Sequence, residues 1–119
     1  MYMFRVSIIG ADSINDKDFC CNKCIKCLKS KNDAGETLQI NSIGDNFVEE
    51  FTKFYNIDCQ YFIADFSQYG KDALITRNNL LMENSDAFIF FFGEKPKKDF
   101  IYLYEMANAT GKPIRKLSK

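Results

Sequence analysis

Short apolar runs alternate along the chain with stretches whose apolar residues recur every three or four positions. Five runs stand out, at residues 4–9, 38–41, 60–64, 87–92 and 113–117. Runs of this length, rich in Ile, Val and Phe and mostly followed by Gly or Asp, are typical of β-strands. The run over 87–92 is apolar at every position, which favours a strand buried on both faces of a parallel sheet.

Amphipathic helices are predicted between these strands. The clearest begins at Asp45, after which apolar side chains share one helical face: Phe47, Val48, Phe51, Phe54 and Tyr55. Further helices are expected over about 16–29, over about 72–83 and from Phe100 to Ala107, and the polar segment 29–36 is expected to be a surface loop. The alternation of strand and helix predicts an α/β fold with a mostly parallel five-stranded sheet flanked by about four helices.

Length and composition place limits on function. The chain has 119 residues, which suits a single domain over 1–119, and its 46% hydrophobic content is too high for a disordered chain. The 16 basic residues are balanced by 16 acidic ones, so binding to long nucleic acids is not expected. There is no histidine, which excludes Ser-His-Asp and Cys-His catalysis and every His-ligated metal site.

The apolar runs also bear on localisation. Even the longest is far shorter than the roughly 20 residues of a membrane span, so no membrane partner is expected. The run over 6–10 is too short for the core of a signal peptide. The odd count of five cysteines, without such a leader, favours a reducing, cytoplasmic compartment.

Four of the five cysteines lie within residues 20–27. Two overlapping C-x-x-C spacings suggest a metal or redox site. However, Cys20, Cys24, Cys27 and Leu28 share one helical face, where cysteines pack as small apolar residues. A zinc site also draws its ligands from separated segments as a rule, and Cys59 stands alone. We favour core packing, with metal binding and redox activity as the alternatives, and expect no metal and no cofactor.

Candidate ligand-binding residues follow the predicted strands, because ligands of parallel α/β sheets bind beyond the carboxyl ends of the strands. Glycine lets a backbone approach a phosphate, and helix N-termini offer free N–H groups. Ordinary turn and capping chemistry is the alternative for each of these residues. The candidates in the turns are Gly10, Asp12, Ser42, Gly44, Asp45, Tyr69, Lys71 and Gly93.

Arg77 and Asn78 are more specific candidates, on the helix that follows the third strand. The chain has few arginines, and the apolar Leu74, Leu80 and Leu81 surround this one in sequence. A planar guanidinium suits bidentate binding of phosphate or carboxylate. A structural ion pair to Asp65 or Asp86 is the alternative.

The order of these features resembles the YspA-like branch of the SLOG superfamily. The residues that carry the resemblance are Ala64-Asp65-Phe66, Tyr69-Gly70-Lys71, Arg77-Asn78, Asp86-Ala87 and Gly111-Lys112-Pro113-Ile114. The superfamily includes the DNA-processing SMF/DprA proteins and the LOG phosphoribohydrolases. The resemblance implies a Rossmann-like three-layer sandwich that binds nucleotides or nucleotide-derived ligands, with a role in nucleotide-signal immunity or phage biology.

The chain departs from that pattern at several glycine-rich motifs. The Gly-Ser-Arg of the first strand is Gly10-Ala11-Asp12 here, the loop after the second strand keeps a single glycine in 42–45, and the Gly-Thr pair after the fourth strand is Lys98-Asp99. The glycine-rich motif with a catalytic Glu that marks the LOG enzymes is also missing. A site that keeps Arg77 and Asn78 but loses these residues is expected to bind a different ligand or none.

The sequence is compatible with three functions. The favoured one is non-catalytic binding, by sensing or sequestering, of a small nucleotide-derived ligand. The second is a homo-oligomeric interaction module with a decayed ligand site, suggested by the surplus of Phe and Tyr. The third is an enzyme that processes N-glycosidic bonds of nucleosides or nucleotides, for which the candidate carboxylates are Asp12, Asp45, Asp65 and Glu105.

Overall fold

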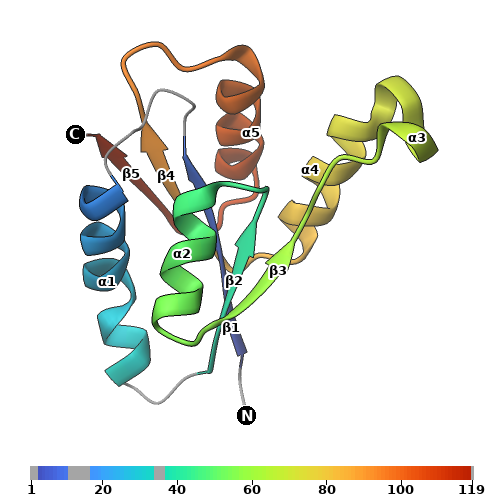
Figure 1. Cartoon of the computed structure of the whole chain (residues 1–119). Helices are drawn as coiled ribbons and strands as arrows, with labels where there is room; N and C mark the ends of the chain where they lie inside the picture. The colour runs from blue at the N-terminus through green and yellow to red at the C-terminus, as the bar shows by residue number, and fades with distance from the viewer. Residues whose placement is uncertain (1–2, 11–16, 34–36, 119) are drawn as a thin grey trace.

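A computed structural model describes residues 3–10, 17–33 and 37–118 of the chain. Strands and helices alternate through almost all of it (Figure 1). The elements are β1 (Met3–Gly10), α1 (Lys17–Asp33), β2 (Thr37–Ser42), α2 (Asn46–Phe54), β3 (Asp58–Tyr61), α3 (Phe66–Tyr69), the 3₁₀ turn η1 (Gly70–Asp72), α4 (Ala73–Glu83), β4 (Ala87–Phe92), α5 (Lys98–Ala109) and β5 (Ile114–Ser118).

The five strands form one sheet in the order β3-β2-β1-β4-β5, and all four pairings are parallel. This confirms the predicted α/β class and makes the sheet wholly parallel. The chain runs outward from β1 through β2 to β3, then crosses back to β4 on the other side of β1. The carboxyl ends of β1 and β4 therefore mark the point where the strand order reverses, which is the usual ligand crevice of such sheets.

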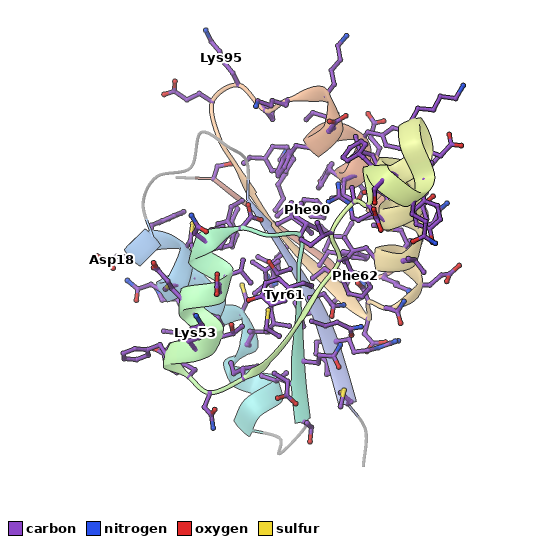
Figure 2. The ribbon with its side chains drawn as sticks, turned by 45° about the vertical axis from the view of Figure 1, so that its right-hand side comes forward. Asp18, Lys53, Tyr61, Phe62, Phe90 and Lys95 are labelled. Atoms are coloured by element: carbon purple, nitrogen blue, oxygen red, sulfur yellow. The ribbon has the colours of Figure 1, made fainter. Side chains whose placement is uncertain are left out.

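Helices cover both faces of the sheet, α1 and α2 on one side and α4 and α5 on the other (Figure 1). The strand β4 supplies both cores, because successive side chains point to opposite faces. Ile89 and Phe91 join the core under α1 and α2, and Phe88 and Phe90 join the core under α4 and α5. Figure 2 shows Phe90 inside the molecule, whereas Lys95 in the following loop points away from it. The prediction of a strand buried on both faces is confirmed.

The cysteine cluster is part of the first core. Cys20, Cys24 and Leu28 are buried with the β1 side chains, and Cys21 and Cys27 are packed partly buried against them. Burial raises the pKa of the Cys24 thiol, and the neighbouring Cys20 adds to the effect. A raised pKa keeps the group a neutral thiol, which packs well and reacts poorly. The core-packing interpretation is confirmed for Cys20 and Cys24.

Some predicted boundaries were wrong. The segment 29–33, expected in a loop, continues α1 to Asp33. The third strand begins two residues before the predicted run, because residues 58–61 pair with 39–42 of β2. The predicted strand was expected to continue to residue 64. After Tyr61, one further backbone hydrogen bond joins the N–H of Phe62 to the carbonyl of Ser42, and the following residues leave the sheet.

The one-turn helix α3 was not predicted. Asp65 begins it, and its carboxylate accepts hydrogen bonds from the N–H groups of Ser67 and Gln68. The Ser67 hydroxyl adds a third bond at 2.6 Å. These bonds, of which that from the Ser67 hydroxyl has the largest effect, hold the pKa of Asp65 below its ordinary value.

Within the part of the chain that the structure describes, no helix is both long and apolar enough to cross a bilayer.

The Gly111-Lys112-Pro113 segment has a structural task at the end of α5. Gly111 adopts a positive φ of 76°, which lets the chain turn after the helix. The Lys112 ammonium then donates to the carbonyls of Met82 and Ser85 at 2.7 and 2.6 Å. It thereby satisfies the Met82 carbonyl in the last turn of α4, which lacks a helical partner, and the Ser85 carbonyl just after that helix. This part of the family-like pattern is explained by helix capping.

A second charged contact joins the start of β1 to the start of β4. The Asp86 carboxylate accepts bonds from the N–H, Nε and Nη2 of Arg5 at 2.9 to 3.2 Å. Partial burial raises the pKa of Asp86, but the bonds and charge of Arg5, with the charge of Lys112, outweigh it and hold the pKa below its ordinary value.

A lowered carboxyl pKa makes stability depend on pH. The stabilisation is present above the unfolded pKa of about 4 and is lost as the pH falls through the folded value. We expect Asp86→Asn to lower the free energy of unfolding by about 1–2 kcal/mol at pH 7, because charge-assisted bonds are lost. The difference should shrink below about pH 4. Urea titrations at several pH values would measure it, with the exposed Asp58→Asn as control; an equal difference at pH 7 and pH 3 would contradict it.

Candidate functional site

The carboxyl ends of β1, β2 and β4 bring several predicted residues to one end of the sheet, which we call the crest. Gly10 ends β1, Ser42 ends β2, and Gly93 directly follows β4. Residues 9–10 pair with 90–91 of β4, so Gly10 and Gly93 flank the point where the strand order reverses. Asp12 lies outside the described residues.

Gly10 and Asp45 are in direct contact. The N–H of Gly10 donates to Asp45 Oδ2 at 3.2 Å. Asp45 precedes α2 as its N-cap, but its side chain makes no capping bond to that helix. The carboxylate therefore joins the end of β1 to the β2–α2 turn. Gly10 also has a packing role, because a Cβ at this position would lie 2.6 Å from the Phe47 ring.

Ser42 and Gly44 shape the turn between β2 and α2. Ser42 is fully buried, and its Oγ accepts from the N–H of Gly44 at 3.0 Å. Gly44 has a φ of 109°, a conformation that only glycine adopts readily. Turn chemistry accounts for both residues, and it holds Asp45 at the crest.

Arg77 and Asn78 lie on α4, facing the sheet. Arg77 is half-buried and Asn78 is 4% exposed. Arg77 Nε donates to Asn78 Oδ1 at 2.7 Å. Among the described residues, neither Nη of Arg77 nor Nδ2 of Asn78 has a hydrogen-bond partner. Two sets of donors thus remain available near the crest.

The charges around Arg77 come from segments far apart in sequence. Burial lowers the pKa of Arg77, and the charges of Asp99 and Asp45 oppose that shift. Asp99 lies in the first turn of α5. The predicted alternative, a structural ion pair from Arg77 to Asp65 or Asp86, was wrong. Asp65 caps α3, Asp86 binds Arg5, and no ion pair of Arg77 is found in the described part of the chain.

Tyr69 and Lys71 are set apart from these residues. Both are exposed, in α3 and η1. The segment packs mainly against α4, and Figure 1 shows α3 at the side of the molecule, beyond the end of α4. Among the described residues, no hydrogen bond or ion pair joins Tyr69 or Lys71 to Arg77 or to the glycines of the crest. The remaining candidates are Gly10, Ser42, Gly44, Asp45 and Gly93 at the strand ends, and Arg77, Asn78 and Asp99 on the helices α4 and α5.

Comparison with family models and with curated proteins found no match to this chain. The resemblance to the SLOG superfamily consequently remains a prediction. The wholly parallel sheet with its reversal between β1 and β4 is the observation that agrees with a Rossmann-like architecture.

The arrangement offers recognition chemistry. Guanidinium and amide N–H groups can donate to an anion or a carbonyl, and the two carboxylates can accept from hydroxyl or amino groups. Of the remaining candidate acids, Asp65 is occupied by its cap and Glu105 is exposed on α5. Among the residues that the structure describes, no group of three or more His, Cys, Asp or Glu is arranged to hold a metal ion.

Asp99 was missed as a site residue. In the family that the chain resembles, a threonine stands at this position, so comparison with its pattern indicated only that a hydroxyl is missing here. The separation of 22 positions between Arg77 and Asp99 in sequence gives no indication that the two lie near each other. Only the parallel pairing of β4 beside β1 brings the first turn of α5 to the crest. A carboxylate in the first turn of a helix is also favoured by the helix dipole, so the sequence alone offered a sufficient structural reason for it.

Proposed function

We propose that the chain binds a small nucleotide-derived ligand at the crest and does not convert it. The observation that carries the proposal is the half-buried Arg77 guanidinium, whose Nη groups have no partner among the described residues. A guanidinium held this way is ready to donate to an anionic or carbonyl oxygen. The charge of Asp45, which binds the N–H of Gly10 at the β1/β4 reversal, acts on this guanidinium, and ligands of such sheets bind at that reversal.

The candidate carboxylates Asp65 and Asp45 support binding over turnover. A general acid needs a raised pKa, whereas hydrogen bonds, chiefly from Ser67, hold that of Asp65 down. Asp45 already accepts the N–H of Gly10. Sensing or sequestering a ligand requires only that these groups bind it. A location in the cytoplasm is part of the same proposal.

Substitution of Arg77 tests the binding proposal. We expect isothermal titration calorimetry to detect binding of a nucleotide-derived compound, such as ADP-ribose or a nucleoside monophosphate. Arg77→Ala should weaken it by about 100-fold or more, because a charged bond in a partly buried site is lost. Lys71→Ala, at an exposed position away from the crest, is the matched control and should keep the affinity. Equal loss in both variants, or no binding by the wild type, would contradict the proposal.

A second candidate function is assembly of two copies of the chain. The segment 63–80 projects at one side of the molecule (Figure 1) and exposes large apolar side chains: Ile63 at 60%, Phe66 at 59%, Tyr69 at 43%, Ile75 at 45% and Leu80 at 45%. At about 150–250 Å² for a large side chain, these fractions leave roughly 450 Å² of surface per copy, about half of what one partner contributes to a standard interface. The zero net charge offers no electrostatic opposition to self-association.

Light scattering after size exclusion tests assembly. We expect the wild type to have twice the chain mass of 13.8 kDa, and Phe66→Glu to have the mass of one chain. Phe54→Glu is the matched control, because Phe54 is 81% exposed on α2, in the opposite layer. Its mass should stay that of two chains. A wild type of 13.8 kDa at about 100 μM, far above the Kd of a stable dimer, would rule out the second candidate.

A further inference from the structure

The strand β3 lies at one side of the sheet and has a free edge (Figure 1). It packs mainly against β2 and α2, and no strand in the described part of the chain pairs with its outer edge. An edge strand carries a row of backbone N–H and C=O groups that can pair with another strand. The sheet has a second such edge, at β5, and the two edges differ in how they are protected.

The β5 edge is protected against pairing. Pro113 directly precedes the strand, and Arg115 and Lys116 lie within it. Proline and charged side chains at an edge oppose pairing with another chain. Residues 58–61 of β3 contain no proline and no basic residue, and their single charge is that of Asp58. The edge that is open to a partner is therefore that of β3.

The pairing of β3 with β2 shows which backbone groups face outward. The N–H of Phe62, just after β3, donates to the carbonyl of Ser42 in β2. Alternate residues of a strand direct their N–H and C=O groups to opposite sides. The even-numbered residues of β3 consequently face β2, and the N–H and C=O groups of Cys59 and Tyr61 face away from the sheet.

Two copies of the chain satisfy these groups when their β3 strands pair antiparallel about a two-fold axis at Gln60. Cys59 then lies opposite Tyr61 of the second copy. Each of the two pairs of this kind exchanges two N–H···O bonds, so that four bonds form. Asp58 lies opposite residue 62 of the second copy, so no like charges face each other across the pair.

The neighbouring registers pair fewer groups. With the axis at Cys59, the bonds would need the N–H of Ile57, which already donates to the carbonyl of Thr52 at 2.9 Å. With the axis at Tyr61, they would need residue 63, which lies beyond the last residue of β3 that pairs with β2. The axis at Gln60 is thus the register in which both outward-facing residues find partners within the strand.

Exposed apolar side chains continue from this edge. Tyr61 is 47% exposed, and six of the ten exposed large apolar side chains in the described part of the chain lie within residues 61–80. The segment 63–80 alone supplies only about half of one partner's share of a standard interface. Pairing at β3 adds contact directly beside it, and the zero net charge of the chain does not oppose contact with an identical copy. The occupant that fits this edge is therefore a second copy of the chain.

We infer that two copies join edge to edge through β3, so that the five strands of each copy form one continuous sheet. The inference rests on the second candidate function, the assembly of two copies, and adds its geometry. The two-fold axis passes at Gln60, and Cys59 of each copy pairs with Tyr61 of the other.

A cysteine at the two-fold axis tests the register. Residues opposite each other in a non-hydrogen-bonded antiparallel pair have Cα atoms about 4.5 Å apart, which a disulfide can span. We expect Gln60→Cys to form a covalent dimer on mild oxidation, seen on a non-reducing gel and reversed by a reductant. Asp58→Cys is the matched control, because its symmetry mate would lie four residues away along the strands. It should stay a single chain, as should the wild type with its native Cys59.

Loss of an outward-facing N–H tests the backbone bonds. Tyr61→Pro removes this donor from each copy, and it leaves the pairing with β2 intact because the N–H of residue 61 does not face β2. Tyr61→Thr is the matched control, since it also removes the ring but keeps the N–H. Analytical ultracentrifugation should give Tyr61→Pro a dimer Kd at least about tenfold higher than that of Tyr61→Thr, because two bonds are lost. Circular dichroism checks that both variants are folded.

Each outcome bears on a different statement. If the wild type has the mass of one chain in light scattering, the second candidate function fails and the inference fails with it. If the wild type is a dimer but Gln60→Cys is cross-linked no more than Asp58→Cys, pairing through β3 is overturned while assembly through the segment 63–80 stands. If both Tyr61 variants dimerise equally, the continuous sheet is overturned. If Tyr61→Pro does not fold, the Gln60→Cys gel alone decides the inference.

Discussion

Phe91→Ala is expected to lower the free energy of unfolding by about 3–5 kcal/mol, the range for removing a large buried aromatic side chain. Phe91 is 0% exposed near the end of β4. Its ring meets those of Phe19 and Phe47 edge to face, with centroids 6.3 and 5.6 Å apart. Truncation would remove both contacts and leave a cavity between the sheet and two helices. Urea unfolding followed by circular dichroism would measure the loss.

Phe54→Ala is the matched control. The residue type and the number of atoms removed are the same, but Phe54 is 81% exposed on α2. We expect a change within about 0.5 kcal/mol, as for most surface substitutions. Similar losses at both positions would show that burial does not set the effect, and would contradict the assignment of Phe91 to the core.

The pattern of residues predicted the fold well because it reflects burial along one element at a time. A run of apolar residues such as 87–92 has one stable placement, with helices on both faces. The helix from Asp45 likewise shows its buried face in its own spacing. The errors lie where local preference is overridden. Residues 60–64 are apolar enough for a strand, but pairing with β2 ends at Tyr61, and the Asp65 cap turns the chain into α3.

The candidate site was less predictable because it depends on contacts between distant segments. Arg77 and Asn78 were recognised from their residue types and their place on a helix. The charges of Asp45 and Asp99 that act on Arg77 belong to other elements, and α5 comes to lie beside α4 only through tertiary packing. Lys71 was predicted to bind the ligand because a lysine suits a phosphate. The structure instead places it on η1, where it is exposed and apart from the crest.

Gly10 has two roles, one predicted from the sequence and one that only the packing of distant segments reveals. As a candidate site residue it allows a ligand to approach the backbone. The structure adds a packing requirement, because a Cβ here would lie 2.6 Å from Phe47 Cε1, closer than any unstrained contact. Phe47 is itself buried and packed edge to face on Phe91. The ring therefore has little room to move aside.

Gly10→Ala is consequently expected to lower the free energy of unfolding by about 2–3 kcal/mol, the upper part of the range for overpacking. A second substitution, Phe47→Leu, removes the clashing ring atoms and should recover at least about 1 kcal/mol of that loss, seen as a coupling energy in a double-mutant cycle. If the two changes are additive within about 0.5 kcal/mol, contact with Phe47 is not the cause of the lost stability.

The double variant Gly10→Ala/Phe47→Leu also tests whether Gly10 contacts a ligand, because it restores the packing while keeping a methyl group at the end of β1. Retained affinity would assign Gly10 to packing, and lost affinity in a stable protein would assign it to the site.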